Sequence, residues 1–172
     1  VPEEGRTLIT VSALLPSAAG AGGMAAHLAR IYNTNGTGAV QICLLADLKQ
    51  AKYPSMPQDE ADIAAMKREI RRLNRQCGNA FVLVVRPRTY SPTMRAYSGW
   101  ERKRGAITQL IRFVRTGQGN FLALEGDIEA LRRTKYLLAL DSDTDMRLDT
   151  VAQLVGTALH PCNRPVIDPI TQ

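Results

Sequence analysis

Three alternating carboxylates, Asp141, Asp143 and Asp145, follow directly after a short apolar run at residues 137–140. Such a run predicts a strand that is buried on both faces, and side chains beyond it reach solvent at its carboxyl end, where open α/β sheets bind ligands. Neighbouring carboxylates repel each other unless a cation lies between them. Asp141 and Asp143 are therefore candidate ligands of a hard divalent metal such as Mg²⁺ or Mn²⁺.

Other functions are compatible with the same aspartates. An EF-hand loop is excluded, because Met146 and Ala152 occupy the positions where that loop needs Gly and Glu. A phosphatase whose nucleophile is the first Asp of a DxDx[TV] motif remains an alternative, although its fifth position is here Asp145. The aspartates could also be turn residues that cap a helix predicted to begin near Leu148. We favour the metal or ligand role.

The chain has 172 residues, of which 45% are hydrophobic. This length and composition fit one ordinary domain, or part of a larger one. No apolar run approaches the roughly 20 residues needed to cross a bilayer, and the first residues lack a charged signal-peptide region, so we expect a soluble chain. Cys43, Cys77 and Cys162 have no CxxC spacing, which favours a reducing cytoplasm over a disulfide framework or a zinc site. His27 and His160 are expected in ordinary helical contexts.

The net charge of +6 and the pI near 9.5 raise the question of nucleic acid binding. The basic residues are, however, spread over several segments with few aromatic residues among them, which argues against it. In the densest run, residues 67–75, Ile70 and Leu73 keep helical spacing, so the charges are predicted to form the solvated face of a surface helix. The charge also suits a phosphate-bearing ligand or a nearby anionic membrane surface.

Strands and helices are predicted to alternate along the chain. Strands are expected at residues 7–15, 39–46, 80–85 and 137–140, and helices at residues 24–32, 59–76, 100–114 and 148–159. Residues 19–23, AGAGG, are expected to form a flexible loop. This alternation predicts an α/β fold with a doubly wound, mostly parallel sheet and helices on both faces.

Polar residues stand at the carboxyl ends of the four predicted strands: Ser17, Asp47, Arg86 and Asp141. In a sheet of strand order 3-2-1-4 the first and fourth strands are neighbours, so Pro16–Ser17 and Asp141 to Asp143 would flank one crevice at the switch point of the sheet. A nucleotide is the expected occupant. The chain contains neither GxGxxG nor GxxxxGK[ST], which disfavours a dinucleotide fold and a P-loop.

Five segments resemble the glycosyltransferase region of cyclic β-1,2-glucan synthases in one collinear order: LLPSAAG, LLADL, VVRPRTYSPTMRAYSGWERKRGAITQL, LLALDSDTDM and LVGTALHPCNRPVID. The resemblance implies a GT-A fold and transfer of glucose from UDP-glucose, with inversion, to build a β-1,2-linked glucan. It also implies a large parent protein of the bacterial inner membrane with this region on the cytoplasmic face.

The resemblance assigns roles to particular residues. Asp141 and Asp143 match the metal-binding DxD, and Asp47 matches an acidic position that faces the uridine. Lys103 and Arg104 precede Gly105 in a pattern found near the nucleotide in related processive enzymes. With the strand-end residues, the expected nucleotide-sugar-binding set is Ser17, Asp47, Arg86, Lys103, Arg104 and Asp141.

No motif identifies the catalytic base that an inverting transferase needs, and Asp168 is a carboxylate without a supporting motif. We therefore expect residues 1–172 to be the donor-binding half of an incomplete domain and to be inactive alone. The expected partners are UDP-glucose, a glucan acceptor and the rest of a membrane-bound parent, with no nucleic acid. A non-catalytic nucleotide-binding or regulatory module of the same fold is the alternative.

Overall fold

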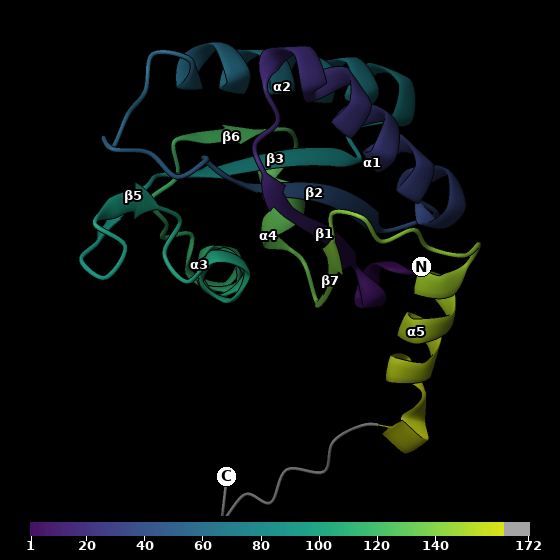
Figure 1. The fold of residues 1–172 in the computed structure, drawn as a ribbon. Coiled ribbons are helices and arrows are strands. Elements are labelled where there is room, and N and C mark those ends of the chain that lie inside the picture. Colours follow the sequence, from purple (N-terminus) through teal and green to yellow (C-terminus); the bar gives the residue numbers. More distant parts are fainter. Residues whose placement is uncertain (164–172) are drawn as a thin grey trace, which may run out of the picture.

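The computed structural model describes residues 1–163 and is built around a five-stranded sheet (Figure 1). The strand order is β6-β3-β2-β1-β7, in which β6 alone is antiparallel to its neighbour. The strands are β1 (Thr7–Leu14), β2 (Val40–Asp47), β3 (Phe81–Arg86), β6 (Ala123–Glu125) and β7 (Tyr136–Asp141). The prediction of a mostly parallel sheet is confirmed, and its four parallel strands have the order 3-2-1-4 that the expected crevice requires.

Helices cover both faces of the sheet, as Figure 1 shows. One face is covered by α1 (Ala21–Asn35) and α2 (Asp59–Cys77), and the other by α3 (Arg102–Thr116) and the short α4 (Ile128–Arg132). The fifth helix, α5 (Thr150–Leu159), packs beside α1 and the 3₁₀ turn Glu3–Gly5. The chain therefore has a Rossmann-like α/β fold. Within residues 1–163, no helix combines the length and apolar character needed to cross a membrane.

The central strand β2 explains why the sheet needs helices on both sides. Its residues alternate between two apolar cores, with Ile42 and Leu44 facing α1 and α2 while Cys43 and Leu45 face α3. All four side chains are essentially inaccessible to water. Burial also raises the pKa of the Cys43 thiol, which stays neutral.

Residues 19–23 form the beginning of a helix, so the prediction of a flexible loop here is wrong. The 3₁₀ turn Ala18–Gly20 leads directly into α1, and Ala21 is buried against the sheet. The backbone N–H of Ala18 donates to the Asp62 carboxylate of α2 at 2.7 Å, which fixes the entry of the chain. Tertiary packing thus overrides the low helix propensity of the glycines.

The strand before the three aspartates is less buried than its sequence predicts. Leu137 and Leu138 are half-buried and Ala139 is exposed, whereas Leu140 is buried. Within residues 1–163, β7 pairs with β1 on one side alone and so lies at the edge of the sheet. The prediction of a strand buried on both faces is therefore wrong, because an apolar run does not reveal whether a strand is central or at an edge.

Four short elements were missed by the sequence analysis. Besides α4 and β6, they are β4 (Thr89–Ser91) and β5 (Ala96–Ser98), which form an antiparallel hairpin outside the main sheet. Each strand among them has three residues, too few for an alternating pattern to be recognised.

A buried ion pair fixes the long connection between β2 and α2. The Arg88 guanidinium donates to the two Asp59 carboxylate oxygens at 2.5 and 2.9 Å, and also to the carbonyls of Lys49 and Pro54 at 2.6 and 3.2 Å. This hydrogen bonding to Arg88 holds the pKa of Asp59 below its usual range, against the opposing effect of burial.

We predict that Asp59→Asn lowers the free energy of unfolding by about 3–5 kcal/mol at neutral pH, because it leaves the Arg88 charge buried without a counter-charge. Since the folded-state pKa of Asp59 is lowered, the wild-type advantage is complete above the unfolded-state pKa, about 4, and disappears as the pH falls through the folded-state value. Urea unfolding at several pH values measures both effects.

The matched control is Glu69→Gln, on the same helix. Glu69 pairs with Arg72 near the surface at 2.8 Å, so its loss should cost less than about 1 kcal/mol. Equal destabilisation by the two substitutions would contradict the role assigned to the Arg88–Asp59 pair.

Candidate functional site

A hollow of about 310 Å³ opens at the carboxyl edge of the sheet and is called here the carboxyl-edge hollow. Its lining comes from the ends of β1, β2 and β7, from the segment after β5 and from the first turn of α3. Charged residues in this lining are Asp47, Arg102, Lys103 and Asp141. The hollow includes the boundary between β1 and β7, which is the switch point of the sheet, where α/β proteins bind their ligands.

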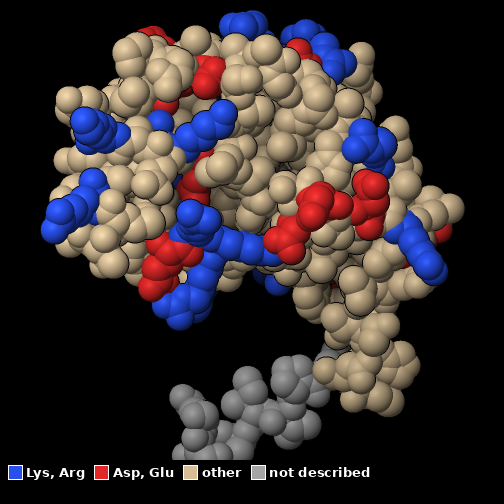
Figure 2. Space-filling view, viewed as in Figure 1, with Lys and Arg blue, Asp and Glu red and all other residues tan. Residues whose placement is uncertain are grey.

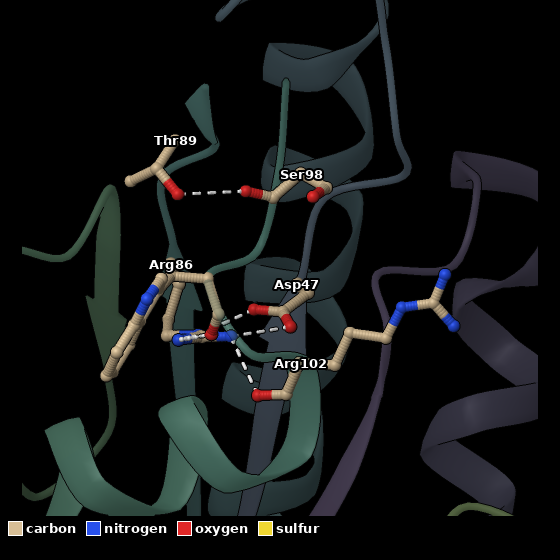
Figure 3. Close-up of polar contacts among 6 residues, drawn as sticks. Asp47, Arg86, Thr89, Ser98 and Arg102 are labelled. Carbon is tan, nitrogen blue, oxygen red and sulfur yellow. Dashed lines mark hydrogen bonds and ion pairs between the residues drawn. The ribbon is translucent and has the colours of Figure 1, made fainter. Parts of the chain in front are cut away.

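Asp47 and Arg86 form a buried ion pair at the wall of this hollow (Figure 3). The two residues are partners in the register of β2 and β3, so both side chains emerge from the same end of adjacent strands. Arg86 Nε and Nη2 donate to the two Asp47 oxygens at 2.6 and 2.7 Å. Because Arg86 is 1% exposed, this charge is compensated within the protein and not by water.

The same guanidinium holds the turn that leads into α3. Arg86 Nη1 donates to the Trp100 carbonyl at 3.1 Å, and Nη2 donates to the Arg102 carbonyl at 3.0 Å. In this turn Glu101 and Arg102 have φ values of 48° and 41°, a left-handed conformation that costs energy for residues with a side chain. Arg86 therefore compensates strain at the point where α3 begins.

Glycines flank the turn for steric reasons. A Cβ atom at Gly99 would lie 2.4 Å from Asp47 Oδ2, which Arg86 holds in place. At Gly105 a Cβ atom would lie 2.1 Å from the Trp100 carbonyl oxygen. Neither position accommodates a side chain without displacing the turn.

The first turn of α3 carries a lysine that reaches across the hollow. Lys103 Nζ donates to Asp141 Oδ1 at 2.5 Å, and both side chains are substantially exposed. Figure 2 shows basic and acidic side chains meeting on this face. Arg104, by contrast, forms an exposed pair with Glu101 at 2.7 Å and does not line the hollow.

The turn after β7 presents its carboxylates to two neighbouring hollows. Asp141 lines the carboxyl-edge hollow, whereas Asp143 and Asp145 line a second one of about 300 Å³ on the side of α1, and Ser142 borders both. Within residues 1–163, no group of three His, Cys, Asp or Glu side chains assembles as a metal site. Two exposed carboxylates nevertheless fit Mg²⁺ or Mn²⁺, because such ions are often held by one or two carboxylates together with water and substrate phosphate.

Helix α1 contacts the segment after β7 from its middle, through His27, and from its last residue, Asn35. His27 Nδ1 lies 3.2 Å from Arg30 Nη2 and 3.9 Å from Asp145 Oδ1. The buried Asn35 amide donates to the Arg147 carbonyl and accepts from the Val151 N–H, both at 3.0 Å. These contacts join residues more than one hundred positions apart, so sequence reasoning had no local signal for Asn35.

The structure brings together part of the expected residue set. Asp47, Lys103 and Asp141 line the carboxyl-edge hollow, and Arg86 lies directly behind Asp47. Ser17 is exposed outside the lining, because the chain turns towards α2 after β1. Asp168 lies outside the described residues.

Ser12 lines the hollow but was missed by the sequence analysis. Its buried hydroxyl has no hydrogen-bond partner within residues 1–163. A polar residue inside the apolar run at residues 8–15 was the available signal.

The fold and the hollow define a Rossmann-like α/β protein with a charged hollow at its switch point. The chain matches no protein-family model. It is 34% identical over 176 residues to NdvB, the cyclic beta-(1,2)-glucan synthase of Rhizobium meliloti (strain 1021). This similarity covers 100% of the chain and 6% of NdvB, and it supports the glucan synthase family that the sequence motifs indicate.

We predict that Arg86→Met lowers the free energy of unfolding by about 3–5 kcal/mol, because it leaves the Asp47 charge and two carbonyls at the wall of the hollow without their donor. Arg104→Met is the matched control, since its exposed pair with Glu101 should contribute less than about 1 kcal/mol. Chemical unfolding of both variants measures the difference. A similar loss in the two would show that the Arg86 network is not the main support of this edge.

Proposed function

We propose that this chain is the donor-binding part of a glycosyltransferase of the GT-A fold, within a larger parent protein that synthesises cyclic β-1,2-glucan. In this proposal the carboxyl-edge hollow binds UDP-glucose. The observation that carries it is the convergence of Asp47, Lys103 and Asp141 from three distant segments on one hollow at the switch point. The similarity to NdvB supports an enzyme of this kind as the parent.

The first turn of α3 is proposed to receive the diphosphate. Lys103 supplies a positive charge, and the unpaired N–H groups at the beginning of a helix favour an anion. Arg102 lines the same side of the hollow and adds a second positive charge. The buried network of Arg86 holds these residues in a fixed position, so little ordering is needed when the ligand binds.

Asp141 and Asp143 are proposed to hold a divalent metal ion, Mg²⁺ or Mn²⁺. When bound, such an ion would neutralise negative charge that develops on the departing UDP. Asp141 orients towards the hollow from the end of β7, whose backbone is fixed by its pairing with β1.

The acceptor is proposed to be activated by a base from another part of the parent protein. Two carboxylates line the carboxyl-edge hollow, and both are engaged in ion pairs, Asp47 with Arg86 and Asp141 with Lys103. We therefore expect the isolated chain to bind the donor without transferring glucose. The parent is proposed to act at the cytoplasmic face of a bacterial inner membrane.

We predict that the 172-residue chain binds UDP in the presence of Mg²⁺ or Mn²⁺ and loses most of this affinity when the metal is removed by a chelator. Isothermal titration calorimetry measures both conditions. Asp141→Asn should bind UDP equally weakly with and without the metal ion. Its free energy of unfolding should be nearly unchanged, because the exposed side chain contributes little to packing.

Asp145→Asn is the matched control, since Asp145 lies on the same turn but is not one of the two aspartates, Asp141 and Asp143, that are proposed to hold the metal ion. It should bind UDP as the wild type does. Metal-independent UDP binding by the wild type would refute the metal role, and an absence of UDP binding under all conditions would refute the nucleotide site.

The Lys103–Asp141 pair leads to a separate prediction about metal binding alone. Because Lys103 competes with a cation for Asp141, Lys103→Ala should bind Mn²⁺ between about 1.4-fold and fivefold more tightly in the absence of nucleotide. The same variant should bind UDP more weakly. Electron paramagnetic resonance of free Mn²⁺ measures the first effect, with Arg104→Ala as a control that should leave Mn²⁺ affinity unchanged. Weaker Mn²⁺ binding by Lys103→Ala would contradict this competition.

A further inference from the structure

The two edges of the main sheet differ in how they are protected from pairing with another strand. β6 has three residues, runs antiparallel to β3 and ends in Glu125, which pairs with Arg71 of α2 at 2.8 Å. A short edge strand with a charged side chain is a common protection against edge-to-edge pairing. β7 has six residues, and residues 136–140 contain neither a charged side chain nor a proline. The edge formed by β7 therefore lacks these protections.

β7 has the sequence of an interior strand although it lies at an edge. A continuous apolar run is typical of parallel strands inside a sheet that is covered on both faces. In the part of the chain that the structure describes, β7 pairs with β1 alone (Figure 1). The backbone N–H and C=O groups that point away from β1 consequently have no strand partner there. Such a row of free groups is a template for a further strand.

The side chains of β7 are incompletely covered on both faces of the sheet. Leu137 packs against the core beneath α3 and Leu138 against the opposite core, and both are half-buried. Ala139 is exposed, whereas Thr10, its register partner in β1, is fully buried. Coverage thus falls from β1 to β7. Side chains of a strand on the far side of β7 would shield these residues.

The free edge of β7 also borders the carboxyl-edge hollow. On this side the lining of the hollow ends with Asp141 and Ser142, because the described residues place no strand beyond β7. A strand that pairs with β7 runs beside it as far as Asp141, whether the two are parallel or antiparallel. One end of that strand would therefore lie next to the turn that carries Asp141 and Asp143, where it adds a wall to the hollow.

We propose that β7 is an interior strand in the larger parent protein, where an extended segment from outside residues 1–172 pairs with its free edge and completes the hollow. The segment is a β-strand with apolar side chains on both faces, which matches the half-buried Leu137 and Leu138. The match to NdvB covers 6% of that protein, so a relative of this chain has ample further sequence. This inference rests on the proposed function for the larger parent, but it is independent of the ligand and of the metal.

Hydrogen exchange of backbone amides tests the pairing. Exchange over β7 is measured by mass spectrometry in the 172-residue chain and in the parent protein. An uncovered edge strand exchanges through small local openings, so β7 should exchange faster than the central strand β2 in the 172-residue chain. In the parent it should exchange at least about tenfold more slowly, because both of its edges are then paired. β6 is the matched control and should exchange alike in both proteins.

A substitution at the exposed Ala139 gives a second measurement. Ala139→Lys adds a charge to the surface of the 172-residue chain, so its midpoint of urea unfolding should stay unchanged. In the parent the same lysine would lie against the added strand and should accelerate the exchange of β7 about tenfold. Thr108→Lys, at an exposed position of α3, is the control and should leave the exchange of β7 unchanged in both proteins.

Failure of this inference is distinguishable from failure of the proposed function. Equal exchange of β7 in the two proteins would overturn the inference even if UDP and Mg²⁺ bind. Protection that disappears when the parent is diluted to a monomer, as measured by sedimentation, would identify a second copy of the chain as the partner and would also overturn it. Protection in the monomeric parent that Ala139→Lys removes supports the inference even if UDP fails to bind.

Discussion

The buried guanidinium of Arg86 is the interaction on which the carboxyl edge of this protein depends. It joins the ends of β2 and β3 through Asp47 and holds two carbonyls of the turn before α3. Burying a charge is costly unless nearly all its donors are satisfied, and here both nitrogens of the fork and Nε have partners. The strained backbone at Glu101 and Arg102 can persist because this network holds it.

Two ion pairs of the same chemistry serve different purposes because their environments differ. Asp47 and Arg86 are shielded from water, so their contact behaves as a fixed part of the fold. Lys103 and Asp141 are largely exposed, and a contact of this kind is weak and exchangeable in water. A rigid pair thus lies behind a pair whose members remain available to a ligand.

The turn after β7 shows the same division between fixed backbone and available side chains. Asn35 and Thr34 of α1 hold the backbone of Arg147, Asp149 and Val151, while the carboxylates of Asp141 and Asp143 remain exposed. Within residues 1–163, the unpaired edge of β7 lies beside this turn.

The sequence by itself determined the parallel strands and the position of Asp141 at a strand end. These features follow from hydrophobic periodicity and from the handedness of strand–helix–strand connections, which are local or general rules. The burial of Ile70 and Leu73 on α2 followed from the same periodicity. The resemblance to glucan synthases was likewise present in the motifs, and the similarity to NdvB supports it.

Only the tertiary structure decided what each polar side chain contacts. Asp47 and Arg86 were both identified as strand-end residues, but their pairing depends on the register of β2 and β3. Ser17 was expected in the crevice, yet the chain turns away at that point because Ala18 bonds to Asp62. The edge position of β7 and the support from Asn35 both depend on contacts between residues far apart in the chain. No local pattern encodes such contacts, because they arise from the packing of the whole chain.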